Sequence, residues 1–205
     1  MTTAALPAPG FADPTRDAQR AFRAILDALA HPARACPLAG PAEPPAVLGP
    51  GLAAVALTLL DSGSVVWLGG ALGSDPETAA WLAFHTGARR TADPAAADFV
   101  IAAPDSLPPL ASLALGTDEA PHLSATVVLD VRGCAGPLRF VAQGPGIDGA
   151  AALAAPWAYD GFAGAWQHNT GLFPRGVDLL LVDFGTVTGL PRTTRLTAAD
   201  SELED

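Results

Sequence analysis

The sequence contains no lysine, because all 11 basic residues of this 205-residue chain are arginines. Without lysine, no side chain can form a Schiff base, no P-loop lysine can reach a phosphate, and no lysine can act as a general base. We therefore expect no pyridoxal phosphate held as an internal aldimine, and we predict no other cofactor.

Charged residues are also scarce, at 16% of the chain, against about 25% in an average soluble domain. The formal net charge is −10 and no basic run is present, so we expect no nucleic-acid partner. So few charges cover the surface of a free monomer poorly, and we expect part of that surface to be buried against protein partners.

Cysteine and histidine are too sparse for a disulfide framework or a metal site. Cys36 and Cys134 have no partner pattern and are expected to be small buried thiols. The four histidines are scattered, and none has a second ligand at metal-binding spacing, so no metal is predicted.

No hydrophobic run is long enough to span a membrane. The longest uncharged apolar stretch, residues 44–60, is interrupted by Pro45, Pro50 and Gly51. The first ten residues, MTTAALPAPG, lack the positive start of a signal peptide. We expect no membrane partner and a cytoplasmic location.

The chain does contain clear helix starts. Asp13–Pro14 and Asp75–Pro76 each place an N-cap residue before a first-turn proline. The first helix should run to Pro32, and the second should end at Gly87 as its C′ glycine. The apolar run at 52–60 is either a buried helix or a buried strand, and its alanine content favours the helix.

Strands alternate with these helices. Short apolar runs predict strands at 64–68, 99–102, 125–131, 138–142, 178–184 and 186–190. Interleaved helices and strands indicate an α/β layered fold, and the closely spaced late strands indicate a mixed sheet. We predict a single domain over 1–205, with a core from about 14 to 196 and an acidic tail from 197 to 205.

The block FHTGARR places His85 and Thr86 at the end of the second helix. There the helix dipole favours a charged imidazole. Either His85 bonds local carbonyls, or it forms a proton-bearing site with Thr86, Arg89 and Arg90.

The block FPRGVDLLLV holds Arg175 between Pro174 and Gly176, just before a strand that begins near Asp178. Arg175 can bind a phosphate or carboxylate through two parallel hydrogen bonds, or it can pair with Asp178. A buried aspartate at a strand start usually caps or pairs.

The block LPRTTR follows the last predicted strand and contains Arg192, Thr193 and Thr194. One arginine with two hydroxyls suits anion binding, a subunit contact or completion of a sheet edge. Gly144-Pro-Gly-Ile147 is favoured as a sharp turn over a phosphate loop. No nucleophile elbow or carboxylate pair is present, so we predict no catalytic residue.

These blocks, in this order and together with AQRAFRAILDALAHP at 18–32, resemble the PhnH family, the H subunit of the bacterial carbon–phosphorus lyase system. The resemblance runs from Ala18 to Arg195. It implies a three-layer α/β/α fold related to pyridoxal-phosphate transferases but without their cofactor site.

The resemblance also implies a function. A family member works with subunits of the G, I and L types, which place a phosphonate on the ribose of ATP in place of adenine, and a J-type subunit is a further expected partner. The family member is expected to act as a scaffold or co-catalytic subunit and to be a homodimer when isolated. The alternative is a stand-alone small-molecule enzyme that binds an anionic ligand at His85, Arg175 and Arg192.

One position departs from the family pattern. After Pro32 the family usually has glycine, whereas this chain has Ala33. If that position needs a positive φ, the alanine will be strained.

Overall fold

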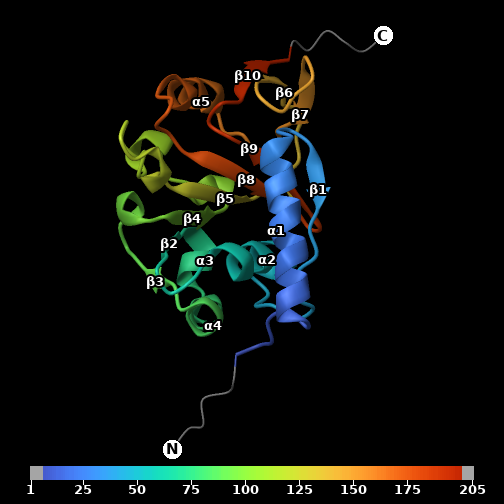
Figure 1. Cartoon of the computed structure of the whole chain (residues 1–205), viewed down its shortest axis with the longest axis vertical. Coiled ribbons are helices and arrows are strands. Elements are labelled where there is room, and N and C mark those ends of the chain that lie inside the picture. Colours follow the sequence, from blue (N-terminus) through green and yellow to red (C-terminus); the bar gives the residue numbers. More distant parts are fainter. Residues whose placement is uncertain (1–6, 200–205) are drawn as a thin grey trace, which may run out of the picture.

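A computed structural model describes residues 7–199 and contains a seven-stranded mixed sheet (Figure 1). In spatial order its strands are β1 (Ala35–Pro37), β9 (Thr186–Leu190), β8 (Asp178–Val182), β5 (Thr126–Asp130), β4 (Phe99–Ala102), β2 (Val65–Leu68) and β3 (Arg89–Arg90). The five strands from β8 to β3 are parallel, and β9 runs antiparallel to both of its neighbours. The predicted mixed sheet is confirmed.

One face of this sheet is covered by helices α1 (Pro14–Ala30), α2 (Gly49–Leu59), α3 (Gly70–Ser74) and α4 (Pro76–Thr86). Ile101, Val128 and Leu180 point from the central strands into this helical layer. The neighbours of these residues along each strand point to the other face, since side chains alternate along a strand. The central strands are therefore buried on both faces, which explains their continuous apolar runs.

The other face is covered by a mixed layer. It contains α5 (Phe162–Gly171) and a small antiparallel sheet in the order β10 (Arg195–Ala198), β6 (Arg139–Gln143) and β7 (Ala151–Ala154). Four 3₁₀ turns complete the fold at Pro94–Ala96, Pro104–Ser106, Leu110–Ser112 and Pro121–Leu123. The predicted α/β class is confirmed, with three layers of which the third combines a helix with strands.

Both predicted helix starts have the expected geometry. The Asp13 side chain accepts a hydrogen bond from Arg16 N–H at 3.0 Å, and Asp75 accepts one from Thr78 N–H at 2.9 Å. Helix α4 ends at Gly87 with φ of 70°, so the predicted C′ glycine is confirmed.

Other boundaries differ from the sequence prediction. Helix α2 begins at Gly49, three residues before the predicted start, and α3, α5, β1, β3, β7 and β10 were not predicted. Strand β10 runs to Ala198, so it occupies the first two residues of the segment predicted as a tail. Residues 200–205 of that acidic segment lie outside the described residues.

Within residues 7–199, Ala33 is the one residue other than glycine that has a positive φ, at +64°. Its N–H donates to the carbonyl oxygen of Gly189 at 3.2 Å. This contact holds the end of α1 against β9. The strain expected from the sequence is therefore present.

The two cysteines are free thiols; Cys36 is buried and Cys134 is partly buried. Burial raises the pKa of both thiols, so neither is activated as a nucleophile. Over residues 7–199, no three histidine, cysteine or carboxylate side chains gather as a metal site would require. Within the same range, no helix has the length and apolar character needed to cross a bilayer.

Candidate functional site

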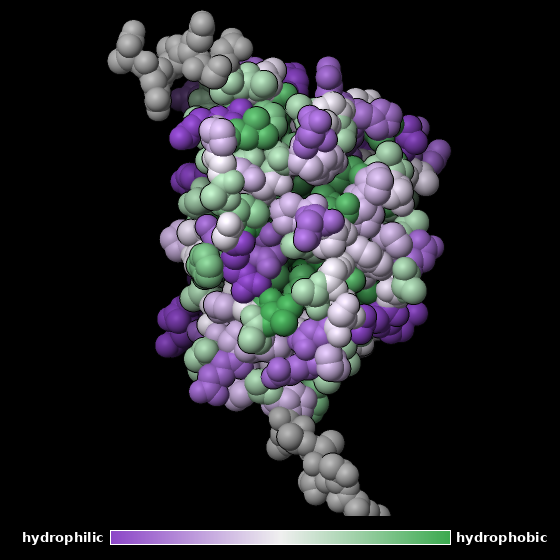
Figure 2. All heavy atoms as spheres, turned by 180° about the vertical axis from the view of Figure 1, so that it is seen from behind, coloured by the Kyte–Doolittle hydropathy of each residue, from purple (hydrophilic) through white to green (hydrophobic). Residues whose placement is uncertain are grey.

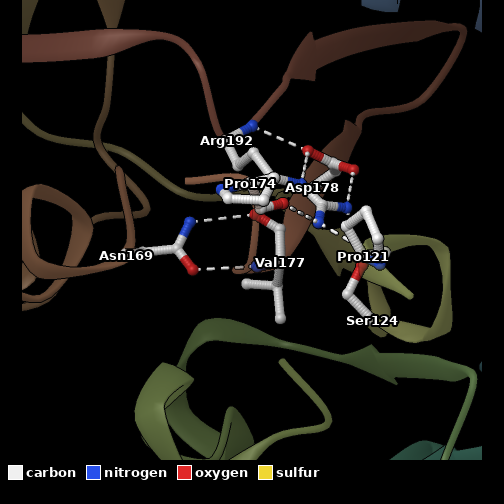
Figure 3. Close-up of polar contacts among 7 residues, drawn as sticks. All are labelled: Pro121, Ser124, Asn169, Pro174, Val177, Asp178 and Arg192. Atoms are coloured by element: carbon white, nitrogen blue, oxygen red, sulfur yellow. Dashed lines mark hydrogen bonds and ion pairs between the residues drawn. The ribbon is translucent and has the colours of Figure 1, made fainter. Parts of the chain in front are cut away.

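Arg192 lies at the centre of the polar contacts in Figure 3, just beyond the end of β9. Its Nε and Nη2 donate to the two carboxylate oxygens of Asp178 at 3.1 and 2.6 Å. Its backbone N–H also donates to Asp178 Oδ1, at 2.7 Å. The arginine and the aspartate therefore form a two-pronged ion pair that closes the β8–β9 hairpin.

The remaining guanidinium donors bind two loops. Nη1 donates to the carbonyl oxygens of Pro121 and Pro174 at 3.2 and 3.1 Å, and Nη2 donates to Ser124 Oγ at 2.6 Å. A guanidinium has five N–H donors, and these contacts use all of them. Arg192 thus fixes the loops before β5 and β8, and it has no donor left for an external anion.

Arg175 does not pair with Asp178, so that sequence interpretation is wrong. Arg175 Nε lies 3.1 Å from Asp118 Oδ1, an ion-pair distance, but at an angle that makes no hydrogen bond. Asp178 instead binds Arg192, in agreement with the expectation that an aspartate at a strand start pairs. Because the Asp118 side chain is 70% exposed and the Arg175 side chain 41%, their contact contributes little to stability.

A second buried polar contact fixes the turn that carries Arg175. The Asn169 amide accepts from Val177 N–H at 2.8 Å and donates to the Val177 carbonyl oxygen at 2.9 Å. Gly176, with φ of +112°, lies so close that a Cβ would stand 2.8 Å from Asn169 Oδ1. Asn169 therefore holds α5 to the start of β8, a role that no sequence motif had indicated.

Thr193 and Thr194 differ in exposure although they are adjacent. Thr194 is fully buried, its carbonyl oxygen accepts from Trp166 Nε1 at 2.8 Å, and its hydroxyl has no hydrogen-bond partner within 7–199. Thr193 lines an open groove of about 980 Å³ between α5 and β10. Of the two hydroxyl residues, Thr193 is the one that a ligand or partner in this groove can reach.

His85 anchors the segment that precedes α1. Its Nε2 lies 2.8 Å from the carbonyl oxygen of Ala8, which also accepts from Trp81 Nε1 at 2.9 Å. Because the shared atom is an acceptor, Nε2 is the nitrogen that carries hydrogen. The Thr86 hydroxyl donates to the Leu82 carbonyl oxygen at 2.6 Å. Thr86 thus bonds a local carbonyl, whereas His85 bonds a carbonyl 77 residues away, so the expectation of a local partner is wrong for His85.

The structure does not bring His85 together with Arg175 and Arg192. Helix α4, which carries His85, lies at the opposite end of the molecule from α5 and β10 (Figure 1). None of the hydrogen-bond partners of His85 is shared with Arg192. A single anion site formed by these three residues is therefore not present in this fold.

The Gly144–Ile147 segment forms the sharp turn favoured from its sequence. Ile147 N–H donates to the Gly144 carbonyl oxygen at 3.2 Å, and Gly146 has φ of +83°. A Cβ on Gly146 would lie 2.1 Å from the Ala30 carbonyl oxygen. The turn packs against the end of α1, and this close approach is why it requires glycine.

A smaller hollow of about 300 Å³ lies at the carboxyl ends of β4 and β5, with Asp130, Arg132 and Cys134 in its wall. Arg132 binds Asp130 through two hydrogen bonds at 2.7 Å and donates to the Val47 carbonyl oxygen at 2.8 Å. The Asp130 contact raises the pKa of Arg132. This pair was not predicted from the sequence, although the spacing Asp-x-Arg after a buried strand is a signal for it.

These contacts define what the arrangement can do chemically. Arg192, Asp178, Asn169 and His85 bind the protein's own backbone and side chains, including the Ser124 hydroxyl, which accepts from Arg192. The polar network positions the loops around the groove between α5 and β10. It is suited to presenting a surface to another molecule.

Comparison with known proteins gives three matches. The model of a family described as "Bacterial phosphonate metabolism protein (PhnH)" matches residues 9–197. The chain is 41% identical over 189 residues to the alpha-D-ribose 1-methylphosphonate 5-triphosphate synthase subunit PhnH of Rhizobium meliloti (strain 1021), covering 91% of this chain and 93% of the relative. It is 36% identical over 183 residues to a putative C-P lyase subunit protein HtxG of Stutzerimonas stutzeri, covering 87% and 85%.

Proposed function

Since the chain belongs to the PhnH family of bacterial phosphonate metabolism proteins, we propose that it is the H-type subunit of a ribose 1-methylphosphonate 5-triphosphate synthase. In this assembly it assists the transfer of an alkylphosphonate to the ribose of ATP, with displacement of adenine. The observation that carries the proposal is the family match over residues 9–197, which includes every element from α1 to β9 and all of β10 except Ala198.

The subunit contributes as a scaffold more than as a source of reacting groups. The strongest polar group of the candidate site, Arg192, has all five donors bound within the chain. His85 and Thr86 likewise bind backbone carbonyl oxygens. These internal contacts support a role in holding partner subunits in place.

The proposed partners are the other carbon–phosphorus lyase subunits, of the G, I, J and L types, together with a second copy of the chain when it is isolated. The sparse charge supports such contacts, and on the face in Figure 2 apolar side chains reach the surface between polar ones. Several large apolar side chains are exposed, at Phe22, Leu26, Phe84, Leu123, Phe173 and Phe184. Exposed apolar surface of this kind favours association.

Reconstitution with the other subunits tests the function. ATP and methylphosphonate are incubated with the G, I and L subunits, with and without this chain. Free adenine is measured by chromatography, and the new phosphonate ester is measured by ³¹P NMR. Adenine release that depends on the chain is the expected result. Release by the chain alone would favour the stand-alone enzyme, and full release without it would contradict the proposal.

The proposal includes no cofactor on this chain. Because there is no lysine, pyridoxal phosphate cannot form an internal aldimine on a side chain. Incubation with pyridoxal phosphate and borohydride should leave every side chain unmodified, as read by peptide mass spectrometry. A reduced adduct on an internal peptide would contradict this part of the proposal.

A further inference from the structure

Strand β10 is an edge strand of the small sheet, because it pairs with β6 on one side and with no other strand within 7–199. Its four residues, Arg195–Ala198, are exposed or half-buried. An uncovered edge is a site where another extended chain can add by backbone hydrogen bonding.

The register identifies which backbone groups face this free edge. Arg195 is paired with Gln143 and Thr197 with Val141, and Ala199 N–H donates to the Arg139 carbonyl oxygen at 3.1 Å. Hydrogen-bonded positions alternate along an antiparallel pair, so Arg195, Thr197 and Ala199 bond inward to β6. The N–H and C=O groups of Leu196 and Ala198 therefore point outward.

A groove runs beside this edge. All four β10 residues line the hollow of about 980 Å³, and α5 faces them with a small-residue surface that includes Gly164 and Gly171. A Cβ built on either glycine would meet no atom within 4 Å. Phe173, which is 63% exposed, also lines the groove. The groove thus offers both open space and an apolar contact to a bound segment.

The charge of the groove differs from that of the whole chain. The chain carries a net charge of −10, yet among residues 7–199 the only charged side chains in the groove wall are Arg192 and Arg195. The donors of Arg192 are all used internally, whereas Arg195 has no ion-pair partner in the described part of the chain. The free positive charge beside an apolar groove is complementary to an acidic ligand.

We propose that an extended segment of another protein subunit, with acidic residues alternating with apolar ones, adds to β10 as a fourth strand of the small sheet. Its backbone bonds to Leu196 and Ala198, an acidic side chain meets Arg195, and apolar side chains contact Phe173 and the glycines of α5. The inference rests on the proposed function only for the source of the segment, which is a neighbouring subunit of the complex.

The first test uses the isolated protein and a defined peptide. A capped hexapeptide in which valine alternates with glutamate is titrated into ¹⁵N-labelled protein. Saturable shifts of the Leu196, Ala198, Gly164 and Gly171 amides are expected, with much weaker binding of the valine–lysine peptide. No saturable shift, or equal binding of both peptides, would overturn the proposal.

The second test removes one outward donor. Ala198→Pro deletes an N–H that faces the free edge and leaves the bonds to β6 intact. Its matched control is Ala152→Pro, an exposed alanine whose N–H faces the outer edge of β7 on the far side of the same sheet. We expect Ala198→Pro to weaken peptide binding about tenfold, as for the loss of one hydrogen bond, and Ala152→Pro to leave it unchanged. Equal effects of the two prolines would contradict docking at β10.

Two further variants separate shape from charge. A Cβ on Gly164 would meet no atom within 4 Å; we expect Gly164→Trp to fill the groove and Gly164→Ala to leave it open, so only the tryptophan should abolish binding. Arg195→Glu should reverse the preference, so that the valine–lysine peptide binds better than the valine–glutamate peptide. An unchanged preference would overturn the assignment of an acidic segment.

The source of the segment is tested in the reconstituted complex. Ala198→Pro and Gly164→Trp should lower the incorporation of this chain, measured by size-exclusion chromatography, whereas Ala152→Pro and Gly164→Ala should not. If all four variants are incorporated normally although the peptide binds at β10, the segment does not come from a neighbouring subunit. The proposed function would then still stand. Failure of the wild-type chain to join the complex would instead contradict the proposed function.

Two other occupants of the groove have distinct signatures. If the peptide binds only after residues 200–205 are deleted, the chain's own acidic end is the ligand. If Ala198→Pro converts a dimer of the isolated protein to a monomer in light scattering, the ligand is a second copy. Either result would contradict a segment from a different subunit.

Discussion

The guanidinium of Arg192 and the carboxylate of Asp178 are joined by two parallel hydrogen bonds, and the Arg192 backbone N–H adds a third to the same carboxylate. The two residues lie 14 positions apart in the sequence and close the hairpin formed by β8 and β9. The same guanidinium reaches the loops that carry Pro121, Ser124 and Pro174. One side chain therefore connects three segments of the fold.

Replacing this side chain should destabilise the protein. Arg192→Ala removes every side-chain bond of this network and leaves a partly buried carboxylate without its partner, so we expect a loss of about 3 kcal/mol in the free energy of unfolding. Urea unfolding followed by tryptophan fluorescence measures it. The control is Arg20→Ala, which breaks an exposed pair with Asp17 and should cost less than about 1 kcal/mol. Equal stabilities of the two variants would show that the Arg192 network is not a structural one.

The strained backbone at Ala33 predicts a stabilising substitution. Ala33→Gly relieves about 1–2 kcal/mol of left-handed strain but costs about 0.5–1 kcal/mol, because glycine gives the unfolded chain more conformational entropy. The net effect should be a gain of about 0.5–1 kcal/mol, measured by thermal and urea unfolding. Ala24→Gly, inside α1, is the control and should destabilise. A less stable Ala33→Gly protein would contradict the prediction.

The turn at Gly144–Ile147 predicts a difference between two glycines of similar φ. Gly149→Ala, at φ of +68° and in open space, should cost about 1 kcal/mol from backbone strain alone. Gly146→Ala should cost at least about 2 kcal/mol more, because its Cβ would lie 2.1 Å from the Ala30 carbonyl oxygen. The measurement is the urea midpoint of each variant. Similar losses at both positions would argue against close packing of the turn on α1.

Asp75 predicts a pH dependence of stability. Hydrogen bonds from the side chain and backbone of Thr78 hold the pKa of Asp75 below its ordinary value of 3.8. A carboxyl group whose folded-state pKa is depressed stabilises the protein above its unfolded pKa, and this contribution is lost as the pH falls through the folded-state pKa.

Asp75→Asn should therefore flatten the decline of the unfolding free energy below about pH 4, because asparagine still caps the helix but does not titrate. Thr78→Val should flatten it in part, since it removes the main cause of the shift. The measurement is urea unfolding at a series of pH values down to about 2. Curves that run parallel to the wild type in both variants would contradict this assignment.

Elements with strong local signals were predicted well from the sequence. Asp13–Pro14 and Asp75–Pro76 set the starts of α1 and α4, because capping depends on neighbouring residues alone. Helix α5 was missed since its N-cap residue is Gly161, which provides no side-chain cap, and since the helix contains two glycines. The edge strands β1, β7 and β10 are three or four residues long, too short for their alternation to stand out.

The partner of Asp178 depends on tertiary structure, although a local signal was present. Nearness in sequence favoured Arg175, but the β8–β9 register pairs Leu179 with Leu190 and so brings Arg192 beside Asp178. Applying the hairpin register to the sequence would have found this pair. The joint anion site of His85 with Arg175 and Arg192 was a hypothesis that sequence order could not test, because the distance between α4 and β9 is set by the whole sheet.

The pairing of β1 with β9 joins Ala35 to Thr188, residues near opposite ends of the chain. During synthesis the nascent chain therefore leaves the ribosome with its first strand unpaired, and α1, which packs on β9 through Gly189, has no sheet to cover. Closure of this sheet edge waits until β9 has emerged, when nearly the whole polypeptide has been made. A message truncated before β9 thus yields a polypeptide whose amphipathic first helix stays exposed to chaperones and proteases.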